Sequence, residues 1–465
     1  MFEINGIIDT DSYKASHYLQ YPPDTTRAFF YLESRGSDRD WHETVFFGLQ
    51  YLLKNYFLEP FTQGMVEEAR EVITAHGEPF NYDGWTRLIE KHGGKLPLRI
   101  RAVPEGSVVP LHNVLMTVET TDDEFAWLGS WFETQLMRVW YAITVCSQSF
   151  QIKKDVYKVL RETADDPDAE ISFKVHDFGA RGVSSQETAA IGGAAHLVNF
   201  LGTDTMAALL LHRRFYHAPM AGFSIPAAEH STITSWGRGH EAEAYRNMLR
   251  NFARPGALVA VVSDSWNIYE AVEKIWGEEL RQEVVDSGAT VVIRPDSGEP
   301  VEVVSRVAAI LAGKFGFDVN SKGYKVLKNV RIIQGDGVNQ NSIRQILERL
   351  KSEGFSASNV AFGIGGSLLQ KVDRDTLKFA YKCSAIVTGG ELREVYKQPI
   401  TDAGKNSKRG RLDLIRDENG EYRTVKLEDV DQRKADNSQL RTVFENGELL
   451  VDDTLDAIRA RAAAM

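Results

Sequence analysis

The pattern of hydrophobic and polar positions changes character along the chain. In its first part the pattern predicts a strand over residues 27–32, two or three strands over 98–120 and a long helical region over 125–160. Turn residues at Pro104-Glu105-Gly106 and His112-Asn113 interrupt the second of these regions. The first third of the chain is therefore expected to mix short strands with helices.

The middle of the chain repeats a short β-branched run, a polar or glycine-rich loop and a helical pattern. The runs cover residues 171–175, 258–262, 290–293, 330–333, 360–362 and 384–387. The clearest helix is expected over 266–285, with Tyr269, Val272, Ile275, Trp276 and Leu280 on one face. Such repeated units predict a parallel sheet with crossover helices and favour a closed or nearly closed barrel, with an open doubly wound sheet as the alternative.

After residue 391 the pattern is again antiparallel. Strands are expected over 411–415, 422–427 and 442–450, with turns at Glu418-Asn419-Gly420 and Glu445-Asn446-Gly447. The predicted fold is α/β. An irregular TIM-like α/β barrel occupies residues 171–385, and a β-rich α+β domain is formed from both chain ends, residues 1–170 and 386–465.

Composition and charge argue against a nucleic-acid-binding, a disulfide-stabilised or a membrane-spanning protein. The 465 residues are 43% hydrophobic and 26% charged, with a formal net charge of -11. An acidic chain of ordinary globular composition argues against a nucleic-acid partner, although residues 397–411 form a local basic segment. The two cysteines make no disulfide framework, and neither a signal peptide nor a membrane-spanning run is evident. A cytoplasmic enzyme without a membrane partner is expected.

Carboxylates follow four of the predicted strands, at Asp177, Asp264, Asp296 and Asp336. Each of these residues taken alone could equally be a helix N-cap. Active sites of barrels lie at the carboxyl ends of the strands, however, and four carboxylates meeting there would repel one another. A cation such as Mg²⁺, or positive charge developing on a substrate, would relieve that repulsion.

Cationic and glycine residues lie among these acids. Arg181 and Arg294 are interpreted either as ion-pair partners of the cluster or as ligands of a phosphate, and the two roles are compatible. Residues 363–367 form a glycine-rich turn before an apolar run, which is a weak phosphate signal by itself but a common phosphate site in a late loop of a barrel.

His230 is the most conspicuous candidate for chemistry. Glu229 precedes it and two hydroxyl residues follow it. A lone histidine is more often structural, but this setting suits a nucleophilic or acid–base imidazole. No zinc-type spacing involves it, since the nearby pair His212 and His217 is five residues apart.

At these residues the sequence becomes recognisable, because it resembles the nicotinamide phosphoribosyltransferases, which are type II phosphoribosyltransferases. The resemblance runs nearly end to end and depends on many segments: residues 10–14, 17–18, 20–23, 43–51, 102–106, 176–179, 181–188, 202–205, 226–232, 293–298 and 334–337. It implies transfer of a phosphoribosyl group from 5-phosphoribosyl 1-diphosphate to nicotinamide, which gives nicotinamide mononucleotide and diphosphate in NAD salvage. It also implies a homodimer, Mg²⁺, and coupling to ATP hydrolysis through a phosphohistidine at His230.

The resemblance also assigns roles to individual residues. Phe178 and Tyr13 of the partner subunit are expected to sandwich the pyridine ring, with Asp204 accepting from the carboxamide, Asp11 nearby and Arg294 at the amide oxygen or ribose. The catalytic set is His230, Asp296, Asp264 and Glu229, and Asp296 and Asp336 are the candidate metal ligands. The predicted phosphate and ribose contacts are Arg181, Ser224, Gly335, Asp336, Gly365, Gly366, Arg374, Arg35, Lys382, Lys397 and Lys405.

Three alanines depart from the family pattern. Ala180 stands where a tyrosine is common, and Ala260 and Ala380 stand where serines are common; they bear on nucleotide and inhibitor fit rather than on the reaction class. The main alternative is a nicotinate phosphoribosyltransferase. Its substrate nicotinate carries a carboxylate, which Asp204 would repel. A phosphosugar isomerase or aldolase, with Lys371 or Lys382 as its base, and a non-catalytic nucleotide-binding protein are the more distant alternatives.

Overall fold

The computed structural model describes residues 4–401, 403–430 and 437–463. The chain divides into two compact units. Unit 1 comprises residues 1–147, 214–218 and 373–465, and unit 2 comprises residues 148–213 and 219–372. Both chain ends thus belong to one unit, while the domain boundaries predicted at residues 170 and 385 differ from those of this division.

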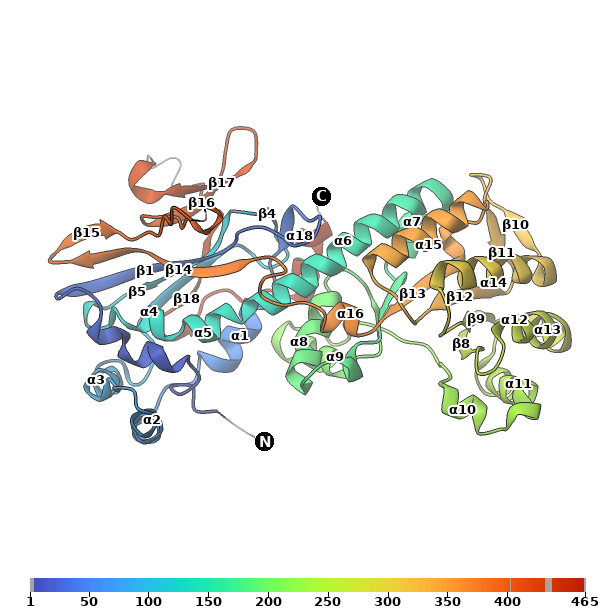
Figure 1. The fold of residues 1–465 in the computed structure, drawn as a ribbon, viewed down its shortest axis with the longest axis horizontal. Helices are drawn as coiled ribbons and strands as arrows, with labels where there is room; N and C mark the ends of the chain where they lie inside the picture. Colours follow the sequence, from blue (N-terminus) through green and yellow to red (C-terminus); the bar gives the residue numbers. More distant parts are fainter. Residues whose placement is uncertain (1–3, 402, 431–436, 464–465) are drawn as a thin grey trace. The chain divides into compact units, whose positions relative to one another are not determined.

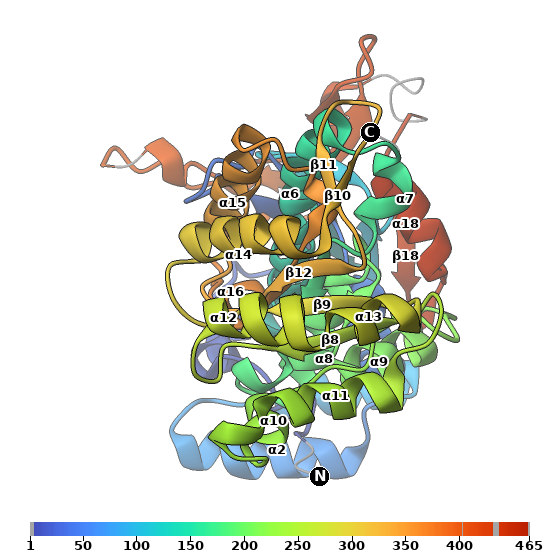
Figure 2. The ribbon, with the colours of Figure 1, turned by 90° about the vertical axis from the view of Figure 1, so that its right-hand side faces the viewer.

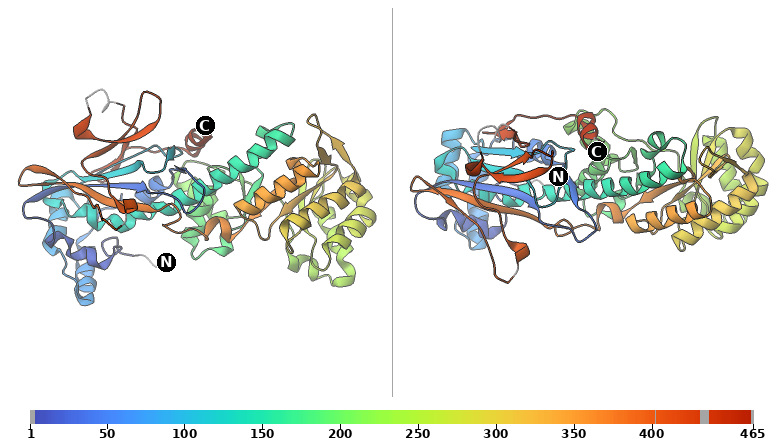
Figure 3. Two further views of the ribbon diagram at one scale, coloured as in Figure 1. Left: turned by 45° about the horizontal axis from the view of Figure 1, so that its top comes forward. Right: turned by 90° about the horizontal axis from the view of Figure 1, so that it is seen from above.

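Unit 1 is built on a seven-stranded sheet in the order β15-β14-β1-β5-β3-β18-β19. Its strands are β1 (Thr25–Ser34), β3 (Leu98–Ala102), β5 (Val114–Thr120), β14 (Phe379–Thr388), β15 (Glu391–Glu394), β18 (Arg441–Glu445) and β19 (Glu448–Leu449). Every pairing in it is antiparallel. Strands from the two chain ends, blue and cyan beside orange and red, therefore lie side by side (Figures 1 and 3).

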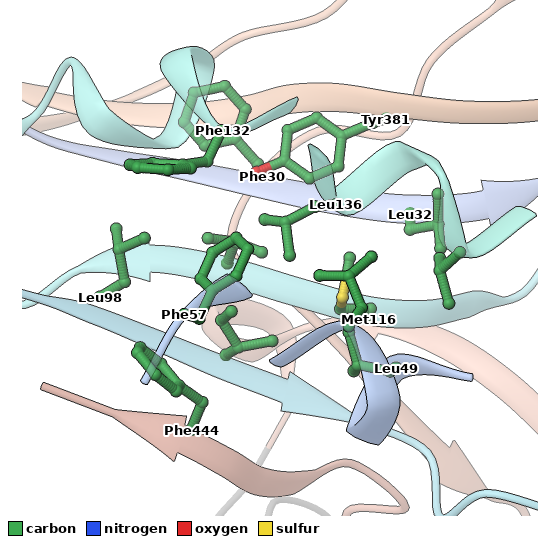
Figure 4. Close-up of a cluster of buried hydrophobic side chains, with 14 of the residues drawn as sticks. Phe30, Leu32, Leu49, Phe57, Leu98, Met116, Phe132, Leu136, Tyr381 and Phe444 are labelled. Carbon is green, nitrogen blue, oxygen red and sulfur yellow. The ribbon is translucent and has the colours of Figure 1, made fainter. Parts of the chain in front are cut away.

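The core of unit 1 is large and apolar. Helices α1 (Leu49–Tyr56), α4 (Leu128–Trp131) and α5 (Glu133–Met137) bring buried side chains against the sheet. Figure 4 shows Phe57, Phe132 and Phe444 within this cluster, with Leu98 and Met116 from the sheet. Strand positions that alternate between buried and half-buried, as in β3, explain why the period-two pattern was readable in the sequence.

The remaining elements of unit 1 are short or peripheral. Gly77 and Gly93 end α2 and α3 in left-handed conformations, the usual termination of a helix by glycine. The other elements are η1 (Ser12–Leu19), β2 (Glu43–Val45), α2 (Gln63–His76), α3 (Tyr82–His92), β4 (Val108–Pro110), η2 (Asp123–Phe125), η7 (Ala403–Lys405), β16 (Leu412–Arg416), β17 (Tyr422–Lys426), η8 (Leu427–Asp429) and α18 (Leu455–Ala463).

Unit 2 contains a six-stranded sheet in the order β7-β6-β13-β12-β9-β8. Its strands are β6 (Val175–Asp177), β7 (Gly202–Thr203), β8 (Leu258–Val262), β9 (Thr290–Arg294), β12 (Val330–Gln334) and β13 (Val360–Ile364), and all pairings are parallel. Figure 2 shows β8, β9 and β12 side by side, with α14 above them.

A short irregular segment joins the two edge strands of this sheet. Phe223 forms a parallel bridge with Gly202 of β7, and Ala227 forms one with Ala260 of β8. Residues 223–227 therefore form an irregular segment between the two edge strands and nearly close the sheet into a barrel. This confirms the predicted barrel-like α/β architecture.

Helices connect the strands of unit 2. Asn339 caps α15 with a reciprocal capping box, and Pro300 occupies the first turn of α14, both of which the sequence signals well. The remaining elements are α7 (Pro167–Ile171), η3 (Ala180–Gly182), α8 (Gln186–His196), α9 (Met206–Phe215), α10 (His230–Thr234), η4 (Arg238–His240), α11 (Glu241–Phe252), α14 (Pro300–Phe315), β10 (Phe317–Val319), β11 (Lys325–Leu327), α15 (Gln340–Ser352), η6 (Ala357–Asn359) and α16 (Gly366–Leu369). The helix α6 (Val139–Thr163) contains the division between the units.

Three predicted elements are wrong in detail. The run at 171–175 is mostly the end of α7 and a turn, and the strand β6 begins only at Val175. The run at 384–387 belongs to β14, which pairs antiparallel with β1 in unit 1 and is no barrel strand. The helix expected over 266–285 is divided into α12 (Ile268–Glu270), the π-helical η5 (Ala271–Glu279) and α13 (Arg281–Ser287).

Within the part of the chain that the structure describes, no helix combines the length and apolar character that crossing a bilayer requires. Neither Cys146 nor Cys383 forms a disulfide within the described residues.

Candidate active site at the barrel mouth

The candidate site lies at the carboxyl edge of the parallel sheet in unit 2. Because all six strands run in one direction, the residues that end or follow them meet at one edge. These residues are Asp177 and Phe178 at the end of β6, Asp204 after β7, Asp264 after β8, Arg294 and Asp296 at the end of β9, Gly335 and Asp336 after β12, and Gly365 and Gly366 after β13.

His230 is held by a buried carboxylate. Its Nε2 lies 3.0 Å from Asp264 Oδ1, and its Nδ1 lies 4.0 Å from Asp296 Oδ2. Asp264 is almost fully buried, and its second oxygen accepts from the Asp296 backbone N–H at 3.0 Å and from the Ser297 hydroxyl. Because a carboxylate oxygen accepts hydrogen bonds, Nε2 is the donor in the contact with Asp264, and Nδ1 is the ring nitrogen nearer Asp296.

Arg294 and Asp296 form an ion pair next to this histidine. Arg294 Nη2 lies 3.0 Å from Asp296 Oδ2, and Nε lies 3.3 Å from Oδ1. A Cβ atom at Gly335 would lie 2.9 Å from Asp296 Oδ1. The glycine therefore lets the neighbouring strand end approach the carboxylate closely.

Phe178 supplies an aromatic face at the same edge. Its backbone N–H donates to Ile364 O at 2.9 Å, and its ring crosses β13 at Gly363, where a Cβ would be only 1.9 Å from Cε2. The Arg294 guanidinium lies 5.8 Å from the ring centroid. The ring packs with Ile225 on a small apolar cluster of Ala260, Val292 and Ile333.

Asp204 is fixed by two donors on one of its oxygens. His176 Nε2 lies 2.9 Å from Oδ1, and Ser224 Oγ donates to the same atom at 2.6 Å. Partial burial raises the pKa of Asp204, but these two hydrogen bonds and the charges of His176 and Arg294 outweigh burial, so the pKa lies below its ordinary value. The carboxylate is therefore ionised at neutral pH.

Asp177 does not join the cluster of functional carboxylates. It is fully buried, its Oδ1 accepts from the Gly179 N–H at 2.7 Å, and its Oδ2 accepts from the Thr203 hydroxyl at 3.4 Å. Burial raises its pKa. Of the four carboxylates expected to converge, this one stabilises its own loop, which is the role of a turn or cap residue.

Glu229 begins helix α10 and contacts hydroxyls of that helix. Its backbone N–H donates to Thr232 Oγ1 at 3.3 Å, its carbonyl accepts from Thr232 N at 3.1 Å, and its carboxylate accepts from the Ser231 hydroxyl. These contacts place His230 at the first turn of α10. The catalytic role assigned to Glu229 itself stays a prediction.

The predicted phosphate residues of unit 2 lie on two adjacent loops. Arg181 is exposed in η3, and a Cβ at the next residue, Gly182, would be 3.3 Å from Gly366 N. The loop of Arg181 and the glycine loop of Gly365 and Gly366 are thus neighbours, as the phosphate hypothesis requires. Asp336 is exposed after β12.

The other predicted residues belong to unit 1 and form two groups there. Asp11 accepts from the Thr134 hydroxyl at 2.5 Å, and Tyr13 is exposed beside His17, with ring centroids 5.0 Å apart. Both lie at the start of η1. They are the residues expected beside the base.

The second group in unit 1 is cationic. Burial lowers the pKa of Lys382; Glu133 opposes this shift, while Arg35, Lys14 and Arg374 add to it, so these cations lie within electrostatic reach of one another. Arg35 Nη1 also donates to the carbonyl of Lys405 at 3.4 Å, and Lys397 exchanges hydrogen bonds with Ser407. Unit 1 thus gathers the predicted diphosphate ligands.

The carboxylates at the barrel mouth suit a magnesium ion that is also bound by substrate phosphates. No group of three or more His, Cys, Asp or Glu side chains suited to a metal occurs within the described residues. Magnesium is commonly held by one or two carboxylates together with substrate phosphates, however. Asp296 and Asp336, on adjacent strand ends, supply hard oxygen donors of that kind.

Two residues that contact the site had no assigned role in the sequence. His176 binds Asp204, and Ser297 binds Asp264. Alternation along a strand could have singled out His176, because a buried Asp177 leaves its neighbour on the opposite face. Of the alanines that depart from the family pattern, Ala260 and Ala380 are buried and Ala180 is exposed.

Two family models match the chain. The nicotinate phosphoribosyltransferase family covers residues 173–448, and the N-terminal domain of nicotinamide phosphoribosyltransferase covers residues 5–100. A relative named nicotinamide phosphoribosyltransferase from Xanthomonas campestris pv. campestris is 59% identical over 99% of this chain and 98% of its own. A relative of the same name from Acinetobacter baylyi is 33% identical over 99% of this chain and 98% of its own.

Solved structures agree on the fold. Nicotinate-nucleotide pyrophosphorylase from Pyrococcus furiosus superposes with a TM-score of 0.62 at 16% identity, covering 99% of this chain and 96% of that one. Human nicotinic acid phosphoribosyltransferase gives 0.56 at 17% identity, covering 97% and 92%. Since one family model spans more than half of the chain and relatives match over its full length, the chain belongs to the nicotinate phosphoribosyltransferase family, together with the relatives named nicotinamide phosphoribosyltransferase.

Proposed function

We propose that this chain is a cytoplasmic pentosyltransferase that joins nicotinamide to 5-phosphoribosyl 1-diphosphate, giving nicotinamide mononucleotide and diphosphate, with ATP hydrolysis coupled through His230. The observation that carries the proposal is the barrel mouth. There an aromatic face at Phe178, an acceptor at Asp204 and the pair of His230 with Asp264 lie at one sheet edge. Full-length relatives named nicotinamide phosphoribosyltransferase support the choice of base.

The base is held by stacking and by one directional hydrogen bond. A flat pyridine ring stacks on Phe178, with Tyr13 of the partner subunit on its other face and Asp11 nearby. The ionised Asp204 accepts from the carboxamide N–H₂, and Arg294 meets the amide oxygen or the ribose. An anionic nicotinate would be repelled by the same carboxylate, which is why the amide is favoured.

The chemical step depends on charge. Diphosphate leaves the ribose C1 with the bonding electron pair, and the lone pair of the pyridine nitrogen forms the new bond to C1. At about 4 Å and an effective dielectric near 20, a carboxylate such as Asp296 stabilises the positive charge developing on the ribose by about 4 kcal/mol. The pyridine nitrogen carries no proton to remove, so no general base is needed.

His230 is the phosphate acceptor in the coupled reaction. Its Nε2 is bound to Asp264 at 3.0 Å, so Nδ1 is the nitrogen that attacks the γ-phosphorus of ATP, and ADP departs with the electrons of the broken P–O bond. Hydrolysis of the N–P bond later returns phosphate and free histidine. A phosphoryl group on Nδ1 adds negative charge next to Asp296 and orders the cations that bind diphosphate.

Phosphate recognition in this proposal needs residues of two subunits. Arg181, Gly365 and Gly366, with Arg374 of the partner subunit, bind the 5′-phosphate, and Ser224, Gly335 and Asp336 lie towards the ribose. Arg35, Lys382, Lys397 and Lys405 of the partner subunit bind diphosphate and the phosphates of ATP, so the functional form is a homodimer. Mg²⁺ held by Asp296 and Asp336, when bound, would neutralise diphosphate charge.

The test mixes the purified chain with nicotinamide, 5-phosphoribosyl 1-diphosphate and Mg²⁺, with and without ATP, and measures the mononucleotide. Product in both cases, with more in the presence of ATP, supports the proposal, and no product in either refutes it. The family model and several solved relatives are named for nicotinate, so kcat/KM is compared for the two bases. A preference for nicotinate would replace this function with that of a nicotinate phosphoribosyltransferase.

A further inference from the structure

The carboxylate of Asp204 is asymmetric in its contacts. Oδ1 receives both donors, His176 Nε2 at 2.9 Å and Ser224 Oγ at 2.6 Å. Among the described residues, no hydrogen bond is made to Oδ2. About half of the Asp204 side chain is exposed, with 47% of its surface accessible. One oxygen is thus anchored to the protein while the other is open to a ligand.

His176 is itself held in place. Its side chain is 14% exposed, and its ring lies 5.2 Å from the Phe178 ring, centroid to centroid. On the other side is Gly202 of β7, where a Cβ would lie 2.6 Å from His176 Nδ1. His176 and Gly202 are also register partners in the parallel pair of β6 and β7. The imidazole therefore fills a slot that the missing side chain of Gly202 leaves.

The two donors come from different parts of the barrel. His176 lies on β6, and Ser224 lies in the irregular segment, residues 223–227, between β7 and β8. Asp204 follows β7 between them, and its backbone N–H donates to Asp177 O at 2.9 Å. The backbone of Asp204 is thus held by a hydrogen bond to the end of β6, and its carboxylate is held by two side-chain hydrogen bonds.

We propose that His176 is a positioning residue for base selection: with Ser224 it holds Oδ1 of Asp204, so that Oδ2 faces the carboxamide N–H₂ of the base. This inference rests on the proposed function. The hydrogen bond from His176 fixes Asp204 while the carboxylate stays ionised, so the site accepts a neutral amide and repels a carboxylate. His176 acts through Asp204 and does not contact the reacting atoms.

The inference predicts a change in selectivity rather than a general loss. A hydrogen bond to a charged group is worth roughly 1.5–3 kcal/mol, so His176→Leu is expected to lower the ratio of kcat/KM for nicotinamide over nicotinate by about 10- to 100-fold. KM for nicotinamide should rise, while KM for 5-phosphoribosyl 1-diphosphate should stay within about twofold. Ser224→Ala, which removes the second donor, should lower the same ratio less.

Rescue by a conservative variant separates positioning from space filling. Glutamine can present an N–H near the place of Nε2, so His176→Gln should recover most of the selectivity that His176→Leu loses. Asp204→Asn serves as the reference for a site whose acceptor charge is gone. In that background His176→Leu should cause no further change in the ratio, because both substitutions act through one carboxylate.

The outcomes distinguish this inference from the proposed function. If the wild-type chain makes no nicotinamide mononucleotide, the proposed function fails and the inference fails with it. If the wild-type chain prefers nicotinamide but His176→Leu keeps the same selectivity ratio, the transferase stands and the positioning role is overturned. Equal loss in His176→Gln and His176→Leu would also overturn it, since a donor at this place would then be irrelevant.

Discussion

The core of unit 1 and the barrel mouth of unit 2 are packed in different ways. Unit 1 packs large aromatic and aliphatic side chains into one continuous core against its antiparallel sheet (Figure 4). At the barrel mouth of unit 2, the apolar cluster among the described residues has three small or medium-sized buried members, Ala260, Val292 and Ile333, and ion pairs and hydrogen-bonded carboxylates lie at the same edge. Substitutions in the first region should therefore change stability, and substitutions in the second should change activity.

The largest expected effect is on ATP coupling and comes from the barrel mouth. His230→Ala removes the proposed phosphate acceptor, so stimulation by ATP should disappear while some ATP-independent synthesis remains. The free energy of unfolding should fall by only about 1 kcal/mol, because Asp264 keeps two other donors. Product formation is measured with and without ATP. His240→Ala is the matched control, since that histidine is exposed and lies 3.5 Å from Glu243. Normal ATP stimulation in His230→Ala would show that His230 is not the phosphate acceptor.

A pair of phenylalanines tests the comparison directly. Phe132 is fully buried in the core of unit 1, so Phe132→Ala should lower the free energy of unfolding by about 3–5 kcal/mol. Phe178 is only partly buried, so Phe178→Ala should cost about 1–2 kcal/mol of stability but raise KM for nicotinamide about tenfold through lost stacking. Denaturant unfolding and steady-state kinetics are measured for both. The comparison breaks if the two variants lose stability equally.

A buried acid in unit 1 gives a pH-dependent test. Burial raises the pKa of Glu105 to about 7, and hydrogen bonds from backbone N–H groups, such as that of Gln50 at 2.7 Å, only partly oppose this. A raised pKa means that the folded state binds the proton more tightly, so this stabilisation is complete below about pH 4.5 and is lost as pH rises to about 7. Glu105→Gln should remove about 1–3 kcal/mol of this pH dependence.

Unfolding midpoints at pH 5 and pH 8 check that result. The wild type should lose more stability than Glu105→Gln over this interval, whereas Asp204, whose pKa is lowered, should contribute no loss there. Identical pH dependence of the two proteins would show that Glu105 ionises normally in the folded state.

The smallest expected effect concerns two glycines of unit 2. A Cβ at Gly363 would meet the Phe178 ring, so Gly363→Ala should displace the ring and raise KM for nicotinamide several-fold. Gly313 lies within α14 with nothing within 4 Å of an added Cβ, so Gly313→Ala should raise the free energy of unfolding by about 0.5–1 kcal/mol and leave KM unchanged. Thermal unfolding and KM are compared; a higher KM in Gly313→Ala would contradict the assignment of the base site.

Several elements were predictable because their signal is local. The strands β8, β9, β12 and β13 coincide with the predicted β-branched runs, which are largely buried on both faces. The turn residues at 445–447 set the hairpin of β18 and β19. The helix from 268 onward was only partly predictable. Its apolar face is real, with Val272 and Trp276 buried, but a π-helical stretch changes the period within it, and periodicity alone does not reveal such a change.

The sequence by itself determined the fold class and the family, and it predicted which residues lie at the carboxyl edge of the parallel sheet. Strand ends followed by Asp264, Asp296 and Asp336 imply a shared edge, because parallel strands bring their carboxyl ends together. Only the tertiary structure decided which carboxylate serves which purpose. Asp177 is buried in its own loop, Asp264 binds His230, and Asp204 is held by His176 and Ser224. Those distinctions depend on contacts between residues far apart in the chain, and local pattern carries no information on such contacts.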